Sequence, residues 1–138
     1  MVCLNGCIYI AGYYFLNSGV RDSLNVQQFW RYSIETKQWK SLKSSNTIRG
    51  KLKFLTLNNC IYAFEEGGRT FERYNIETDA WEYISHPDSS IFSFKTTAHN
   101  GSIYVLDGKF LKIYNPQKDV WIHIKNTFPA GTKPYALI

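Results

Sequence analysis

Short runs in which apolar and polar residues alternate cover most of the chain, and turn residues separate them. The clearest series has runs at Leu52–Leu57, Cys60–Phe64, Phe71–Ile76 and Ala80–Ile84. Asn58-Asn59 separates the first two runs, and asparagine tolerates the positive φ of a tight hairpin turn. No stretch sustains the 3.6-residue period of an amphipathic helix. The pattern therefore predicts a unit of four short antiparallel strands.

This unit occurs three times. An Asn-containing turn followed by an apolar residue and a tyrosine is found at Leu4–Tyr9, Leu57–Tyr62 and His99–Tyr104. Further along each unit a tryptophan follows a tyrosine by seven residues, and the three tryptophans recur at intervals of 42 and 40 residues. Four strands in a repeat of about 40 residues are typical of a propeller blade. We predict an all-β chain with blades at about 1–43, 50–85 and 91–125, and with 132–138 as a candidate first strand of a further blade.

On these residues the chain resembles the kelch-repeat family, and in particular the propellers of kelch-like (BTB–BACK–kelch) proteins. The family's glycine pair is kept only as Gly67-Gly68, whereas the other units have the single glycines Gly12 and Gly108. In the first unit Tyr32 also follows Tyr9 by 23 residues, where the corresponding spacings in the other units are 12 and 10. The resemblance implies rings of five to seven blades, and three blades do not close a ring. We expect part of a longer propeller first, a six-bladed ring of two copies second, and an autonomous half-propeller last.

The residues that recur once per blade are expected to be structural, because large aromatic side chains at a repeated position wedge neighbouring blades together. Cys7 and Cys60 also share a repeat position and are interpreted as small buried hydrophobic residues. The structural blade residues are Tyr9, Tyr32, Trp39, Tyr62, Gly67, Gly68, Tyr74, Trp81, Tyr104, Tyr114 and Trp121.

Composition and spacing argue against catalysis. A hydrophobic content of 44% excludes disorder, and no apolar run approaches the roughly 20 residues of a membrane helix. The three His and three Cys have no metal-ligand spacing, and there is no phosphate-binding glycine loop or nucleophile elbow. We expect no metal, no cofactor and no enzymatic activity, and three unpatterned cysteines suggest a cytoplasmic protein.

Basic residues gather between positions 37 and 53, where six lysines and arginines occur without an acid. The plain interpretation is a solvated basic face. The resemblance implies instead that the loops at one end of the blades bind a partner. On that basis the candidate partner-binding residues are Tyr13, Tyr14, Phe15, Arg21, Arg49 and Arg69. Because the arginine fork matches a carboxylate, an acidic peptide or degron is the expected ligand. A net charge of +5 without stacking repeats does not favour nucleic acid, and we expect no membrane binding.

The expected function is that of a protein-interaction module. The resemblance implies the substrate-recognition propeller, or a fragment of it, of a cullin-type ubiquitin ligase adaptor. Contact with the ligase would then require BTB and BACK domains, which nothing in these 138 residues matches. The alternatives are a structural module bound to actin filaments and a propeller of the copper oxidase type. A homodimer that completes a ring is a further expectation.

Overall fold

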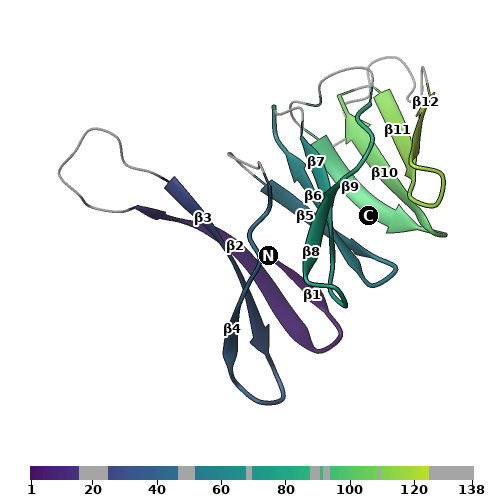
Figure 1. Cartoon of the computed structure of the whole chain (residues 1–138). Coiled ribbons are helices and arrows are strands. Elements are labelled where there is room, and N and C mark those ends of the chain that lie inside the picture. Colours follow the sequence, from purple (N-terminus) through teal and green to yellow (C-terminus); the bar gives the residue numbers. More distant parts are fainter. Residues whose placement is uncertain are drawn as a thin grey trace.

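The structure, a computed structural model, describes residues 1–15, 25–46, 52–67, 70–87, 91, 94–108 and 110–124, with the backbone alone at 13–15 and 25–27. This part of the chain forms three four-stranded antiparallel sheets and contains no helix (Figure 1). The predicted all-β class and its four-stranded blades are confirmed. No helix of the described residues is long and apolar enough to span a membrane.

The three sheets are named blades I, II and III, and in each the strands pair in chain order. Blade I contains β1 (Val2–Leu4), β2 (Cys7–Phe15), β3 (Asn25–Ser33) and β4 (Trp39–Leu42). Blade II contains β5 (Leu52–Leu57), β6 (Cys60–Glu65), β7 (Phe71–Asn75) and β8 (Ala80–Tyr83). Blade III contains β9 (Phe94–His99), β10 (Ser102–Asp107), β11 (Phe110–Asn115) and β12 (Val120–Ile124). Strand ends differ from the sequence prediction by one or two residues, as is usual at fraying termini.

The same two-residue turn joins the first two strands of every blade. Leu4 pairs with Cys7, Leu57 with Cys60, and His99 with Ser102, so the register is equivalent in the three hairpins. The turn residues take positive φ, which Asn and Gly adopt at little cost. Since a shift of one residue would turn every side chain to the other face, these turns decide which residues face the neighbouring blade.

The blades follow one another in chain order, with blade II between the other two (Figure 1). Their first strands contact each other, β1 with β5 and β5 with β9. First strands that meet while the later strands lie further out are the arrangement of propeller blades around an axis.

The core consists of two aromatic layers, one at each junction between blades. The layer between blades I and II is built on Tyr9, Phe29, Ile61 and Tyr74. The layer between blades II and III is larger, and its buried members are Tyr62, Phe64, Phe71, Ile84, Ile91, Phe94, Ile103, Val105 and Tyr114. Blade II is thus covered on both faces, and in the described chain no sheet covers the outer faces of blades I and III.

The assignment of 1–138 to a single partial propeller stays a prediction. Its candidate additional strand at 132–138 lies outside the described residues.

Candidate functional site: the blade junctions and the loop end

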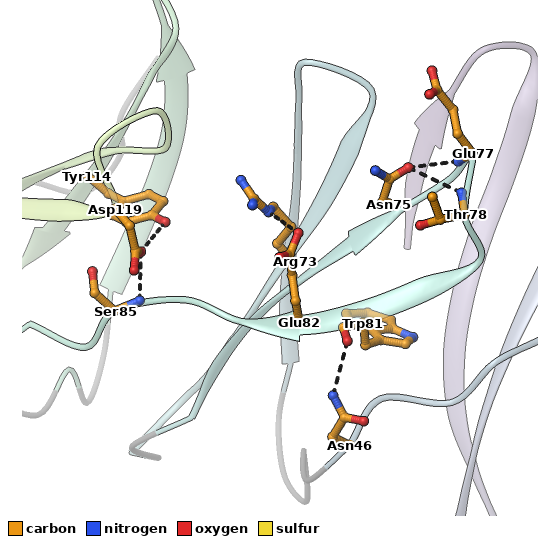
Figure 2. Close-up of polar contacts among 10 residues, drawn as sticks. All are labelled: Asn46, Arg73, Asn75, Glu77, Thr78, Trp81, Glu82, Ser85, Tyr114 and Asp119. Atoms are coloured by element: carbon orange, nitrogen blue, oxygen red, sulfur yellow. Dashed lines mark hydrogen bonds and ion pairs between the residues drawn. The ribbon is translucent and has the colours of Figure 1, made fainter.

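A hydrogen-bonded clasp joins blades II and III. Asp119 precedes β12, and its carboxylate oxygen Oδ1 accepts from the hydroxyl of Tyr114 at 2.7 Å and from the backbone N–H of Ser85 at 2.8 Å (Figure 2). The indole N–H of Trp121 donates to the carbonyl of the same Ser85 at 2.8 Å. Blade III therefore satisfies both backbone polar groups of the residue that leaves blade II.

The junction between blades I and II repeats this clasp. Asp79 Oδ1 accepts from Tyr74 at 2.7 Å and from the N–H of Lys43 at 3.2 Å. Trp81 donates to the carbonyl of Lys43 at 2.7 Å. Paired backbone groups outside the strand ladders are strongly favoured when they are partly shielded from water. The clasp thus fixes the exit of one blade onto the face of the next.

Burial and hydrogen bonding move the pKa values of the aspartate and the tyrosine of each clasp in opposite directions. The hydrogen bond from Tyr74 lowers the pKa of Asp79, an effect that outweighs the opposing burial. Burial raises the pKa of Asp119, but hydrogen bonds from Tyr114 and Ser85 more than offset it, so that this pKa is also lowered. Burial, and then the hydrogen bond to the aspartate, raises the pKa of both tyrosines. Each pair therefore stays as an aspartate anion and a neutral tyrosine across the neutral range.

Blade I carries only part of the clasp on its outer face. Lys37 has the positive φ of Asp79 and Asp119, 56° against 50° and 51°, but it places an amine where they place a carboxylate. Trp39 stacks at a tilt on Tyr32, with ring centroids 5.0 Å apart, and remains 56% exposed. No described sheet packs on that side of blade I, so the assignment of Trp39 as a wedge between two blades stays a prediction.

The segment that leaves blade I continues along blade II to a buried carboxylate. Glu72 in β7 is fully buried, and its Oε1 accepts from the backbone N–H of Asn46 at 3.1 Å. The Asn46 side chain donates to the carbonyl of Trp81 (Figure 2). Oε2 of Glu72 has no hydrogen-bond partner, and burial raises the pKa of this carboxyl. Glu72 therefore anchors the linker between blades I and II. The cost is a buried carboxyl group with one oxygen that has no hydrogen-bond partner.

At the loop end of the blades, one lysine connects blades II and III. Lys53 in β5 forms an ion pair with Glu66 at 2.8 Å and lies over the ring of Phe94, 4.4 Å from its centroid. Its ammonium also donates to the carbonyl of Phe94. Lys53 thus fixes the base of the loop between β6 and β7 against the first strand of blade III.

The predicted partner-binding residues cannot be placed relative to this lysine. Arg21, Arg49 and Arg69 lie outside the described residues, and for Tyr13, Tyr14 and Phe15 only the backbone in β2 is described. These assignments stay predictions.

Of the predicted structural residues, the structure places Tyr9, Tyr62, Tyr74 and Tyr114 in the two aromatic layers, each at most 2% exposed. Trp81 and Trp121 pack against these layers. Tyr32 and Tyr104 are half-buried on the outer faces, Gly67 takes a φ of 72° before β7, and Gly68 is not described.

The cysteines and other potential ligands do not assemble. Cys7 and Cys60 are half-buried against the aromatic layers, Cys3 is exposed, and burial raises the pKa of the Cys60 thiol. Within the described part of the chain, no three His, Cys, Asp or Glu side chains come close enough to hold a metal ion.

Comparison with known proteins supports the kelch resemblance. The chain is 28% identical over 127 residues to "Kelch repeat and BTB domain-containing protein 8" of Rattus norvegicus and of Mus musculus, and 27% identical to the Homo sapiens protein of that name. These alignments cover 83% of this chain but only 21–22% of the relatives' length, so the chain spans about a fifth of the curated relatives it matches. No family model matches the chain. Together with the three four-stranded sheets, this similarity confirms the resemblance to kelch propellers.

Proposed function

We propose that the chain is a non-enzymatic protein-interaction module whose blades hold a set of loops in place for a partner. The observation that carries the proposal is the double clasp of Asp79 and Asp119, which joins three kelch-type blades through backbone groups. A scaffold that fixes its blades in this way suits loop-based recognition, because binding residues are commonly found on loops held by rigid elements.

We further propose the loop end as the binding face, with an acidic peptide or degron as ligand. Support comes from the candidate residues Arg49 and Arg69, which belong to the β4–β5 and β6–β7 connections. Among the described residues, Lys53 is a further cation in the first strand of blade II, where Glu66 already neutralises part of its charge. Arginine guanidinium groups bind carboxylates through two parallel hydrogen bonds, and they are frequent among the residues that dominate interface energies.

The ligase role is a proposal about a larger assembly. The relatives' name includes a BTB domain, and this chain aligns with only a fifth of their length. We propose that the blades select a substrate for a cullin-type ubiquitin ligase in the cytoplasm. Contact with the ligase would be made by BTB and BACK domains on other chain segments or subunits.

The binding face is tested with fluorescein-labelled peptides rich in Asp and Glu, measured by fluorescence anisotropy. We expect one or more sequences to bind, and Arg49→Ala combined with Arg69→Ala to weaken the binding at least tenfold. The control is Lys40→Ala combined with Lys118→Ala, which removes the same charge from exposed positions. Equal losses of affinity in both variants would show that the effect comes from net charge alone. Unchanged affinity in the arginine variant would contradict the proposed binding face.

The class of function is tested separately. Cosedimentation with actin filaments in the absence of any peptide partner would favour the cytoskeletal alternative. Stoichiometric copper in the purified protein would favour the oxidase alternative. The proposal expects neither result.

A further inference from the structure

An arginine occupies the same position in blades I and II, but its neighbour on the fourth strand differs. Arg73 in β7 lies opposite Glu82 in β8, and its Nε donates to the carboxylate oxygen Oε1 of Glu82 at 2.6 Å (Figure 2). Arg31 in β3 lies opposite Lys40 in β4 at the equivalent register. Side chains directly opposite on neighbouring strands share one face of the sheet. Blade I therefore sets two cations side by side where blade II has an ion pair.

Arg31 lacks an acceptor at the atom that holds the carboxylate in blade II. Because Arg31 also lies opposite Tyr9, a member of the layer between blades I and II, its side chain is on the face toward blade II. The guanidinium donates to the hydroxyl of Tyr9, as that of Arg73 donates to Tyr62. The Nε of Arg31 is buried, and within the described chain it has no hydrogen-bond partner. A buried donor without an acceptor is unfavourable, so an oxyanion at this nitrogen would be stabilised.

The surroundings of Arg31 keep an excess of positive charge. After the hydrogen bond from Tyr74, the charges of Lys40 and Lys43 lower the pKa of the Asp79 carboxyl, so both exposed lysines lie near this acid of blade II. Asp79 is already engaged, since its Oδ1 accepts from Tyr74 and from the N–H of Lys43. The three cations, named the cation cluster, are Arg31, Lys40 and Lys43, and in the described chain none of them forms an ion pair.

The cation cluster borders the turn between β3 and β4. Arg31 is two residues from the end of β3, and Lys40 is the second residue of β4. The loop between β2 and β3 is at the far end of the same hairpin. The turn contains Glu35, but blade II has Glu77 at the same place, so this acid does not replace Glu82. The difference in charge between the two blades therefore comes from the position opposite the arginine.

We propose that the cation cluster binds a phosphoryl group, with the Nε of Arg31 as its buried donor. The carboxylate of Glu82 shows where an oxyanion meets this arginine atom in blade II. Three cations and one engaged acid leave two positive charges, and a phosphate monoester carries about −1.5 to −2 charges at pH 7, whereas a carboxylate carries one. Arginine binds phosphate through its planar fork and lysine through a compact charge. The exposed side chain of Lys40 can turn to admit the ligand.

This inference rests on the cation cluster and not on the proposed binding function. The test is a titration of the 138-residue chain with inorganic phosphate at constant ionic strength, followed by NMR of the arginine Nε–H signals. The Nε–H signal of Arg31 and the backbone amide of Lys40 are expected to shift and to saturate. Arg73 is the internal control, because Glu82 already accepts from its Nε, and its signal is expected to stay in place. Shifts that never saturate, or that are as large at Arg73 as at Arg31, would overturn the site.

Lys40→Glu supplies the carboxylate that blade II has at this position. This variant is expected to raise the dissociation constant for phosphate about tenfold or more, because its own carboxylate competes for Arg31. Its thermal midpoint is expected to be at least that of the parent, so lost binding is not lost folding. The matched control is Lys37→Glu, which makes the same charge change in the same turn and is expected to stay within about threefold of the parent. Equal losses of affinity in the two variants would overturn the site.

Blocked phosphoserine and acetate, titrated in the same way, identify the source and the class of the ligand. Tighter binding of blocked phosphoserine than of inorganic phosphate would support the site with a phosphorylated side chain as its ligand. The reverse order would support the site with free phosphate as its ligand. Acetate that binds as tightly as phosphate would overturn the assignment to a phosphoryl group.

Discussion

The indole of Trp81 lies edge-on against the ring of Phe29 in the preceding blade, with centroids 5.1 Å apart and planes at 66°. In blade III, Trp121 makes the corresponding contact with Phe71 of blade II, at 5.9 Å. A tryptophan thus joins blade II to blade I and blade III to blade II, through its ring and its indole N–H together.

Replacement of this tryptophan should therefore weaken the whole chain. Trp81→Ala is expected to lower the free energy of unfolding by about 3 kcal/mol, because it removes a large aromatic group and a hydrogen bond from a junction. Trp39→Ala is the matched control, since its ring is 56% exposed, and it is expected to cost less than about 1 kcal/mol. Urea unfolding at low micromolar concentration measures both, and equal losses would contradict the assignment of Trp81 to a junction.

The clasp aspartate predicts a specific acid sensitivity. The pKa of Asp79 is lowered in the folded state, so its contribution to stability is present above the unfolded pKa of about 3.9 and is lost as the pH falls through the folded value. Asp79→Asn is expected to cost about 1 kcal/mol at pH 7, a typical hydrogen-bond contribution.

The difference between Asp79→Asn and the parent should shrink as the pH falls below about 4. Unfolding curves at several pH values measure it, with Glu77→Gln in the same turn as the control for a lost exposed carboxylate. A constant difference at all pH values would show that the charge of Asp79 has no part in the clasp.

Glu72 predicts the opposite dependence. Burial raises its pKa in the folded state, so its contribution to stability is present below the unfolded pKa and is lost as the pH rises through the folded value. Glu72→Gln keeps an Oε1 acceptor for the N–H of Asn46 and removes the buried charge. This variant is expected to equal or exceed the parent's stability at pH 8, by an amount that grows with pH.

Glu72→Ala supplies the control, because it leaves the N–H of Asn46 without its acceptor and is expected to cost about 1–2 kcal/mol. Thermal unfolding from pH 5 to pH 8 distinguishes the two variants. A glutamine variant that is less stable than the parent at pH 8 would mean that the ionised carboxylate itself holds the linker.

The sequence predicts the sheets well because their determinants are local. Asn5-Gly6, Asn58-Asn59 and Asn100-Gly101 each specify a tight turn, and the spacing of seven residues from Tyr74 to Trp81 repeats in all three blades. These features set the strand registers without reference to any distant residue.

The junction chemistry was missed at the sequence level, although a signal was present. Asp79 and Asp119 both lie two residues before the phased tryptophan, where the first unit has Lys37. Their partners are the backbone groups of Lys43 and Ser85, some 35 residues away, which no side-chain pattern identifies. The exposure of Trp39 also depends on what packs against it, and the repeat alone treats it as equivalent to Trp81 and Trp121.

The central claim is that the blades are joined through the backbone of Lys43 and Ser85, and amide hydrogen exchange by NMR tests it most directly. Both N–H groups lie outside the strands, yet each donates to an aspartate of the next blade. The account predicts that they exchange about as slowly as strand amides, and that Asp119→Asn removes the protection of Ser85 more than that of Lys43. Exchange of both amides at the rate of an open chain, with the strands still protected, would contradict it.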